Sequence, residues 1–125
     1  MKIVAIAVAL LFVLTASPAH AGKGIFEAPM VSATTGAEVP GSEGKIERDG
    51  IFKVEVPAAD AGMYTLCVHQ GLSSIPLGTT TLTTGGELKF EGDLSAMTLV
   101  APYFVIHSGD SCTGSDAYVS GLTLI

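Results

Sequence analysis

After residue 21 the chain alternates between short runs of apolar and β-branched residues and breaks rich in glycine, proline and aspartate. Apolar positions at helical intervals of three and four residues are nearly absent from this part of the chain. Short runs separated by turn-forming residues are typical of strands joined by tight connections. The pattern therefore predicts an all-β domain.

The clearest predicted hairpin covers residues 44–56 and turns at Asp49-Gly50. These two residues supply the positive φ angles of a tight hairpin turn. Side chains alternate between the two faces of a strand, so Lys53 and Glu55 fall on one face and the apolar positions on the other. The inward positions are Ile46, Phe52, Val54 and Val56. We expect the apolar face to be buried.

A second hairpin is predicted from residues 77–82 and 87–91, which flank the sequence Thr-Thr-Gly-Gly at 83–86. Leu88 and Phe90 then face inward. The alternate positions are charged and face solvent: Glu87, Lys89 and Glu91. Two hairpins with one polar face each indicate antiparallel sheets.

Four further segments predict strands: residues 25–33, 63–69, 98–107 and 118–125. Pro29 breaks the first segment and makes it irregular. In the second, Tyr64, Leu66 and Val68 share one face while Thr65, Cys67 and His69 share the other. The third is apolar on both faces, as in a central strand, and Pro102 must lie at a bulge or an edge because it cannot donate to a sheet.

About seven or eight strands at this spacing predict an antiparallel β-sandwich of two sheets, immunoglobulin-like in general architecture. A small closed β-barrel is the alternative fold.

Residues 60–67 resemble the tyrosine-corner motif of immunoglobulin domains, in which Asp, Gly, Tyr and Cys precede and open a strand. In that family the Cys follows the Tyr by two residues and shares its face. Here Cys67 follows Tyr64 by three residues and must point to the opposite face. This Cys is also the first of the pair, and no Trp lies between the two. The resemblance implies a sandwich-like corner and not membership in the family.

The amino terminus has the features of a secretory signal peptide. Lys2 precedes the apolar run 3–14, and Ala19-His20-Ala21 places small residues at the positions that signal peptidase reads. The run is shorter than the roughly 20 residues that span a bilayer, which disfavours an uncleaved anchor. We expect cleavage between Ala21 and Gly22, a single domain at residues 22–125, and a bacterial source. Since Gly22 is not Cys, the acylated lipoprotein form is not supported.

Charge limits the classes of partner. The chain has 6 Lys and Arg, 12 Asp and Glu, and a formal net charge of −6, which becomes −7 when Lys2 is removed with the signal peptide. The remaining cations are scattered among acidic residues, so no basic patch is available for nucleic acid or anionic lipid. We expect an unidentified protein or surface partner, and a monomer.

The two cysteines, Cys67 and Cys112, predict one disulfide, because an oxidising compartment joins thiol pairs and only one pairing exists. In the chain-entropy account, a loop of this length stabilises the fold by roughly 4 kcal/mol. A metal or redox pair would need closer spacing or neighbouring histidines.

No constellation in the chain predicts catalysis, a cofactor or a metal. His107, Ser108 and Asp110 are close in sequence, whereas a nucleophilic triad converges from separate elements. His69 is expected, like His107, to be a lone, solvated residue at a strand end rather than part of a shared metal site.

Two acidic groups are also interpreted as surface features. Residues 110–116 offer oxygen ligands at alternate positions, as calcium loops do, but lack the closing Glu of an EF-hand, so we expect a polar turn pinned by the disulfide. Glu43, Glu47 and Glu55 are expected to face solvent, without the apolar surroundings that raise a carboxyl pKa.

Together these features predict a secreted or periplasmic, non-catalytic β-sandwich with a binding, structural or surface-interaction role. One alternative is a subunit of an extracellular assembly that pairs strands through residues 122–125. The other is a small secreted hydrolase.

Overall fold

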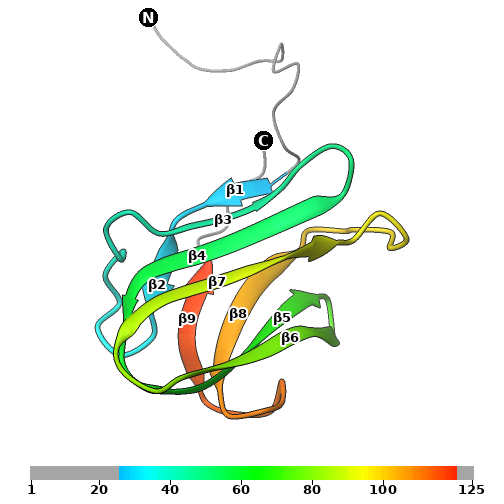
Figure 1. The fold of residues 1–125 in the computed structure, drawn as a ribbon. Coiled ribbons are helices and arrows are strands. Elements are labelled where there is room, and N and C mark those ends of the chain that lie inside the picture. The colour runs from blue at the N-terminus through cyan, green and yellow to red at the C-terminus, as the bar shows by residue number, and fades with distance from the viewer. Residues whose placement is uncertain (1–25, 121–125) are drawn as a thin grey trace, which may run out of the picture.

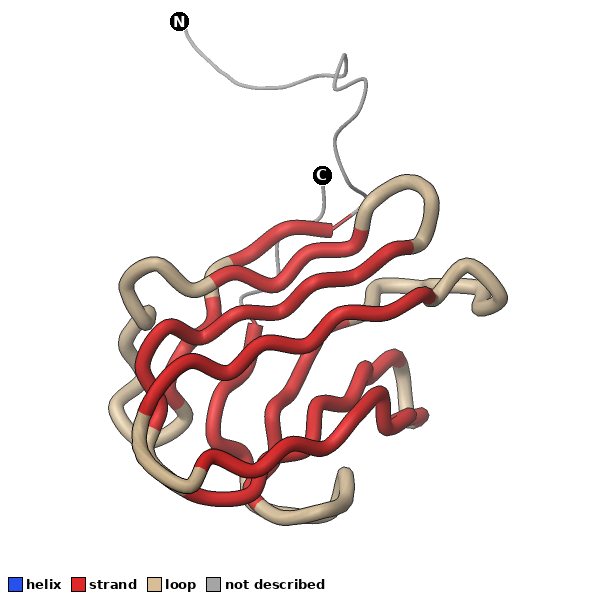
Figure 2. The backbone as a smooth tube through the Cα atoms, in the orientation of Figure 1, coloured by secondary structure: helices blue, strands red, loops and turns tan. Residues whose placement is uncertain are grey.

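The strands form two antiparallel sheets that pack face to face (Figures 1 and 2). Buried and exposed side chains alternate along most of these strands, so each sheet has an inner and an outer face. The computed structural model describes residues 26–120. One sheet contains, in spatial order, β1 (Phe26–Ala28), β3 (Glu43–Ile46), β4 (Ile51–Ala59) and β7 (Gly86–Asp93). The other contains β2 (Met30–Ser32), β9 (Asp116–Ser120), β8 (Tyr103–Ser108), β5 (Gly62–Gln70) and β6 (Ser73–Leu82). The predicted β-sandwich is confirmed, and the sheets do not close into a barrel.

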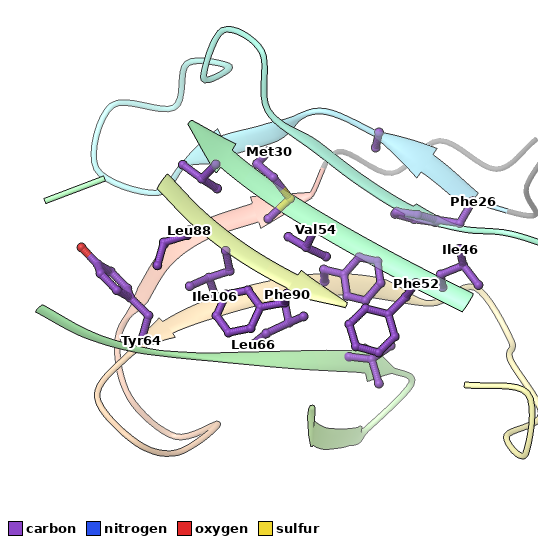
Figure 3. Close-up of a cluster of buried hydrophobic side chains, with 14 of the residues drawn as sticks. Phe26, Met30, Ile46, Phe52, Val54, Tyr64, Leu66, Leu88, Phe90 and Ile106 are labelled. Carbon is purple, nitrogen blue, oxygen red and sulfur yellow. The ribbon is translucent and has the colours of Figure 1, made fainter. Parts of the chain in front are cut away.

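The core lies between the sheets and is formed by the inward-facing positions of both (Figure 3). Phe104 of β8 connects the two layers, because its ring packs edge-on against Phe26, with centroids 5.8 Å apart, and in a tilted arrangement against Phe52, with centroids 5.9 Å apart. The other inward positions predicted from the alternation are also buried: Ile46, Val54, Val56, Tyr64, Leu66, Val68, Leu88 and Phe90. The period of two in the sequence therefore identifies the inward faces correctly.

The hairpin of β3 and β4 is confirmed, with Ile46 opposite Phe52. Its turn is longer than predicted and spans residues 47–50, closed by a hydrogen bond from the Glu47 amide to the Ile51 carbonyl. Only Gly50 of the two predicted residues has a positive φ, of 90°. A Cβ at this position would also lie 2.7 Å from the Ser95 backbone, so both conformation and space require glycine.

The predicted hairpin across residues 83–86 is wrong. β6 pairs with β5 in one sheet, whereas β7 pairs with β4 in the other, so this turn connects the two sheets. Glycine pairs signal a reversal of the chain, and a reversal at the end of a sandwich can lead to the facing sheet as easily as to a neighbouring strand. The hairpin partner of β6 is β5, joined through Gly71, whose φ is 59°.

Three predicted strands have different bounds in the structure. The first segment forms two strands, because the chain passes from one sheet to the other at Pro29. Residues 98–102 are not part of β8, and Pro102 directly precedes it, where no sheet donor is required. β9 begins at Asp116, and residues 121–125 lie outside the described part of the chain, so only residues 118–120 of the predicted terminal strand are described.

The outer face of the first sheet is a lattice of opposite charges. Lys53 and Lys89 both lie within 4 Å of the Glu55 carboxylate, and Lys89 also lies 3.8 Å from Glu91. Lys45 is directly opposite Lys53, a repulsive pairing that Glu91 offsets from the next strand. This face is therefore solvated and stabilised by weak surface ion pairs.

The corner at residues 60–64 has the hydrogen bond of a tyrosine corner. The Tyr64 hydroxyl donates to the Asp60 carbonyl at 2.8 Å, four residues upstream. Tyr64 faces the core while Cys67 faces outward, as the three-residue spacing predicts. The resemblance to immunoglobulin domains thus extends to the corner itself.

Replacing Phe52 with Ala should lower the free energy of unfolding by about 3 to 5 kcal/mol, because the buried ring leaves a cavity beside Phe104. Replacing the adjacent, outward-facing Lys53 should cost less than about 1 kcal/mol, since its ion pair is at the surface. Equilibrium urea unfolding of the two variants measures the difference. A larger loss for the lysine variant would contradict the assignment of faces.

Candidate functional site

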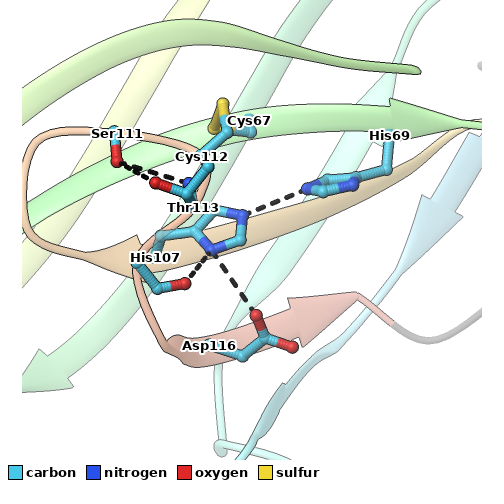
Figure 4. A network of polar contacts seen from close by, with 8 residues as sticks. Cys67, His69, His107, Ser111, Cys112, Thr113 and Asp116 are labelled. Carbon is cyan, nitrogen blue, oxygen red and sulfur yellow. Dashed lines mark hydrogen bonds and ion pairs between the residues drawn. A yellow bond between two sulfur atoms is a disulfide. The ribbon is translucent and has the colours of Figure 1, made fainter. Parts of the chain in front are cut away.

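The outer face of the second sheet differs from that of the first because part of it is buried. Cys67 points away from the core, yet its exposed fraction is 0%, and His107 on the neighbouring β8 is only 3% exposed. The cover is the connection between β8 and β9, residues 109–115, which we call the covering loop. The predicted disulfide between Cys67 and Cys112 ties this loop to β5, with the two Cα atoms 6.0 Å apart (Figure 4).

Hydrogen bonds at both ends hold the covering loop in the same place. The Thr65 hydroxyl donates to the Gly109 carbonyl at 2.8 Å and contacts the Thr79 hydroxyl at 2.9 Å. At the other end, the Ser108 amide donates to the Ser115 carbonyl at 2.8 Å. The loop therefore supplies partners for polar groups that it removes from water.

His107 has a different partner at each ring nitrogen. Nδ1 lies 2.8 Å from the Gly114 carbonyl oxygen and 3.4 Å from the Asp116 carboxylate. Nε2 lies 3.1 Å from Nε2 of His69 (Figure 4). A carbonyl oxygen can only accept a hydrogen bond, so Nδ1 carries the proton and donates it. In neutral His107, Nε2 is consequently the acceptor, and His69 donates to it.

His69 completes the cluster from β5. Its ring stacks on Tyr103, directly opposite on β8, with centroids 5.3 Å apart and planes 19° from parallel. Burial, followed by the neighbouring His107, lowers the pKa of His69 below its ordinary value, and Asp116 acts in the opposite direction. The neutral form of His69 is thus favoured in the folded protein. We call His69, His107 and Asp116 the histidine cluster.

The expectation of two lone, solvated histidines is wrong. His107 is opposite Thr65, four residues along β5 from His69, and the two rings reach toward each other over Cys67 and Val105. One feature of the sequence pointed to this arrangement: His69 is two residues from Cys67 on β5, so it lies on the face that the disulfide and the covering loop occupy. The pairing of β5 with β8, which brings His107 onto the same face, is not encoded in either strand alone.

The structure does not assemble the hydrolase constellation. Both ring nitrogens of His107 are directed to His69, Gly114 and Asp116, so neither is directed to Ser108 or Asp110. In residues 110–116 the Ser111 hydroxyl contacts the Thr113 hydroxyl at 2.8 Å. Among residues 26–120, no group of three or more His, Cys, Asp or Glu side chains could hold a metal ion.

One of the three glutamates predicted to be solvated is in a different environment. Burial, and next a hydrogen bond with Glu27, raise the pKa of Glu43 above its ordinary value. Glu27 is on β1 and Glu43 is on β3, where the outer face of the first sheet brings the two acids together. The expectation that Glu43 lacks surroundings that raise its pKa is therefore wrong.

A shallow hollow of about 250 Å³ lies between the β3–β4 turn and the segment 94–99. Glu47, Arg48 and Asp49 form its charged side, and Leu94, Met97 and Leu99 its apolar side. Its charged residues all come from one turn, so it is a less organised arrangement than the histidine cluster.

Comparison of the chain with protein-family models, with curated proteins and with solved structures gives no match. Within residues 26–120, no helix has the length and apolar character needed to cross a membrane.

The lowered pKa of His69 predicts a loss of stability in acid. Below about pH 6.5, the ordinary value for histidine, the unfolded chain takes up a proton at this residue before the folded chain does, so the free energy of unfolding falls until the pH passes the folded-state pKa. The measurement is the urea midpoint of unfolding, in the presence of a chelator, from about pH 7.5 to about pH 5. We expect this midpoint to fall as the pH is lowered.

His69→Gln is the matched variant for this test, because it keeps a polar side chain but does not titrate. Its stability should fall less steeply than that of the natural protein over the same range of pH. Identical slopes for the two proteins would contradict the assignment.

Proposed function

We propose that this protein is an exported, non-catalytic β-sandwich domain, secreted or periplasmic and of bacterial origin, that binds a protein or surface partner. The observation that carries the proposal is the disulfide, which joins a fully buried cysteine of β5 to the covering loop. A structural disulfide persists in oxidising compartments outside the cytoplasm. This agrees with the export signal predicted at residues 1–21, which lies outside the described residues.

The non-catalytic part of the proposal is supported by the contacts of His107. A general base needs a ring nitrogen directed at the group it deprotonates. Both nitrogens of His107 are instead directed to fixed neighbours, and one of these is a backbone carbonyl. We therefore favour binding over hydrolysis as the role of this domain.

The protein recovered from the periplasm or medium of a bacterial host should begin at Gly22 and contain no free thiol. Intact mass measured before and after reduction and alkylation tests both points, because only the reduced protein should gain two alkyl groups. A retained Met1, or alkylation of Cys67 and Cys112 without reduction, would count against export.

Assembly through strand pairing is a second candidate, and β6 favours it. This strand is at the edge of the second sheet, contains ten residues, and carries no charged side chain. Exposed edges without charges are able to pair with a strand of another chain. Pro76 limits this tendency, since proline cannot donate a hydrogen bond to a new neighbour.

If β6 pairs with a second copy, the mass in solution should rise with protein concentration, and the exposed Thr81→Lys variant should remain monomeric. Thr84→Lys, in the connection beyond the strand, is the matched control and should behave as the natural protein. Sedimentation equilibrium over a wide range of concentrations measures this. A constant monomer mass for all three proteins would eliminate self-pairing.

A further inference from the structure

We propose that His69 and His107 bind one divalent transition-metal ion through their Nε2 atoms, with water completing the coordination. This goes beyond a binding or structural role for the domain, and it departs from our expectation from sequence that no metal site exists. The argument rests on the convergence of the two nitrogens, the orientation of His107, and the access to His69.

The two nitrogens are already at the separation that a shared ion requires. They lie 3.1 Å apart. Two imidazole nitrogens at about 2.0 to 2.1 Å from one Zn²⁺ are separated by this amount when the angle at the metal is about 100°, between the square and tetrahedral values. The backbones of β5 and β8 therefore need not move to admit an ion.

His107 has the outer contacts of a metal ligand. Metal-binding histidines commonly donate the proton of their second nitrogen to a carbonyl or carboxylate, which fixes the tautomer and the ring orientation. Nδ1 of His107 lies 2.8 Å from the Gly114 carbonyl and 3.4 Å from the Asp116 carboxylate. Because Nδ1 carries the proton, the free lone pair of His107 is on Nε2, the nitrogen that faces His69, and Asp116 adds negative charge on the Nδ1 side of the ring.

His69 is the ligand that must adjust more. Its ring centroid is 5.3 Å from that of His107, so the rings meet almost head-on and share a hydrogen bond in the metal-free protein. An ion bound to both nitrogens lies to one side of the line between them, so both rings must turn toward it. His69 can turn further than His107, because His107 is held at Nδ1 by the Gly114 carbonyl.

Proton balance follows from the same contacts. In the metal-free pair, His69 donates its Nε2 proton to His107. On binding, that proton moves to Nδ1 of His69 by exchange with water, and both Nε2 lone pairs coordinate the ion. Neutral histidines therefore release no net proton. His69 is partly exposed, so the ion and its remaining water ligands can reach the site from its side.

Two protein ligands make a weaker site than the three or four of structural zinc centres. Because Cu²⁺ forms the most stable complexes of the divalent first-row series with nitrogen ligands, it should bind more tightly than Zn²⁺. The probes are therefore Cu²⁺ in electron paramagnetic resonance and Zn²⁺ in calorimetry, each with the untagged, disulfide-intact mature protein.

One ion per chain is expected, with nitrogen hyperfine structure from two imidazoles in the copper spectrum. His69→Gln should lose one of the two nitrogens and weaken binding by more than about tenfold. Asp116→Asn should weaken binding by about tenfold while retaining both nitrogens, because it acts only on the Nδ1 side of His107.

Thr84→Gln, an exposed change in the connection between β6 and β7, is the matched control and should bind as the natural protein does. Circular dichroism of each variant establishes that it is folded. We replace His69 and not His107 because His69 is less buried, so its replacement disturbs the fold less. Equal copper spectra and affinities for the natural protein and a folded His69→Gln variant would overturn the proposal, as would the absence of binding. Either result would leave the pair as a hydrogen bond alone, and neither would bear on export of the domain.

Discussion

The burial of the outer face of the second sheet depends on the disulfide between Cys67 and Cys112. It holds the covering loop over β5 and β8, and this cover excludes water from Thr65 and His107. Buried polar groups without partners would destabilise the fold by about 1 to 3 kcal/mol each. The loop offsets this penalty because its own carbonyls, at Gly109 and Gly114, accept hydrogen bonds from those groups. The disulfide, the position of the covering loop and the hydrogen bonds of Thr65 and His107 therefore depend on one another.

The outer face of the first sheet is exposed to water, whereas part of the outer face of the second sheet is buried under the covering loop. The first sheet leaves its outer face in water, and this face carries alternating charges that form weak surface ion pairs. The second has no such lattice on β5, where Thr65 and Cys67 are uncharged and burial lowers the pKa of His69, which favours its neutral form. A covering loop suits that composition, since uncharged groups can be buried at a lower cost than ions.

Sequence alternation predicted the inward faces of β3, β4, β5 and β7, because burial on one side imposes a period of two that a single strand displays. It also predicted the disulfide, since two cysteines allow one pairing. It predicted the pairing of β3 with β4 but not that of β6 or β7, because the glycines at 85 and 86 mark a turn whether the next strand joins the same sheet or the opposite one. The histidine cluster escaped prediction for this reason, since it exists only through the register of β5 against β8.

The histidine cluster lies outside the core that joins the two sheets. The core between the sheets is apolar and is connected by Phe104, on the opposite side of β8 from His107. Replacing a buried polar pair with apolar side chains of similar shape is often neutral or stabilising. Tyr103 and Val105, the neighbours of His107 on the outer face of β8, show that apolar side chains fit there. A pair of imidazoles with one fixed tautomer and one partly exposed ring therefore fits the metal-binding role that we propose.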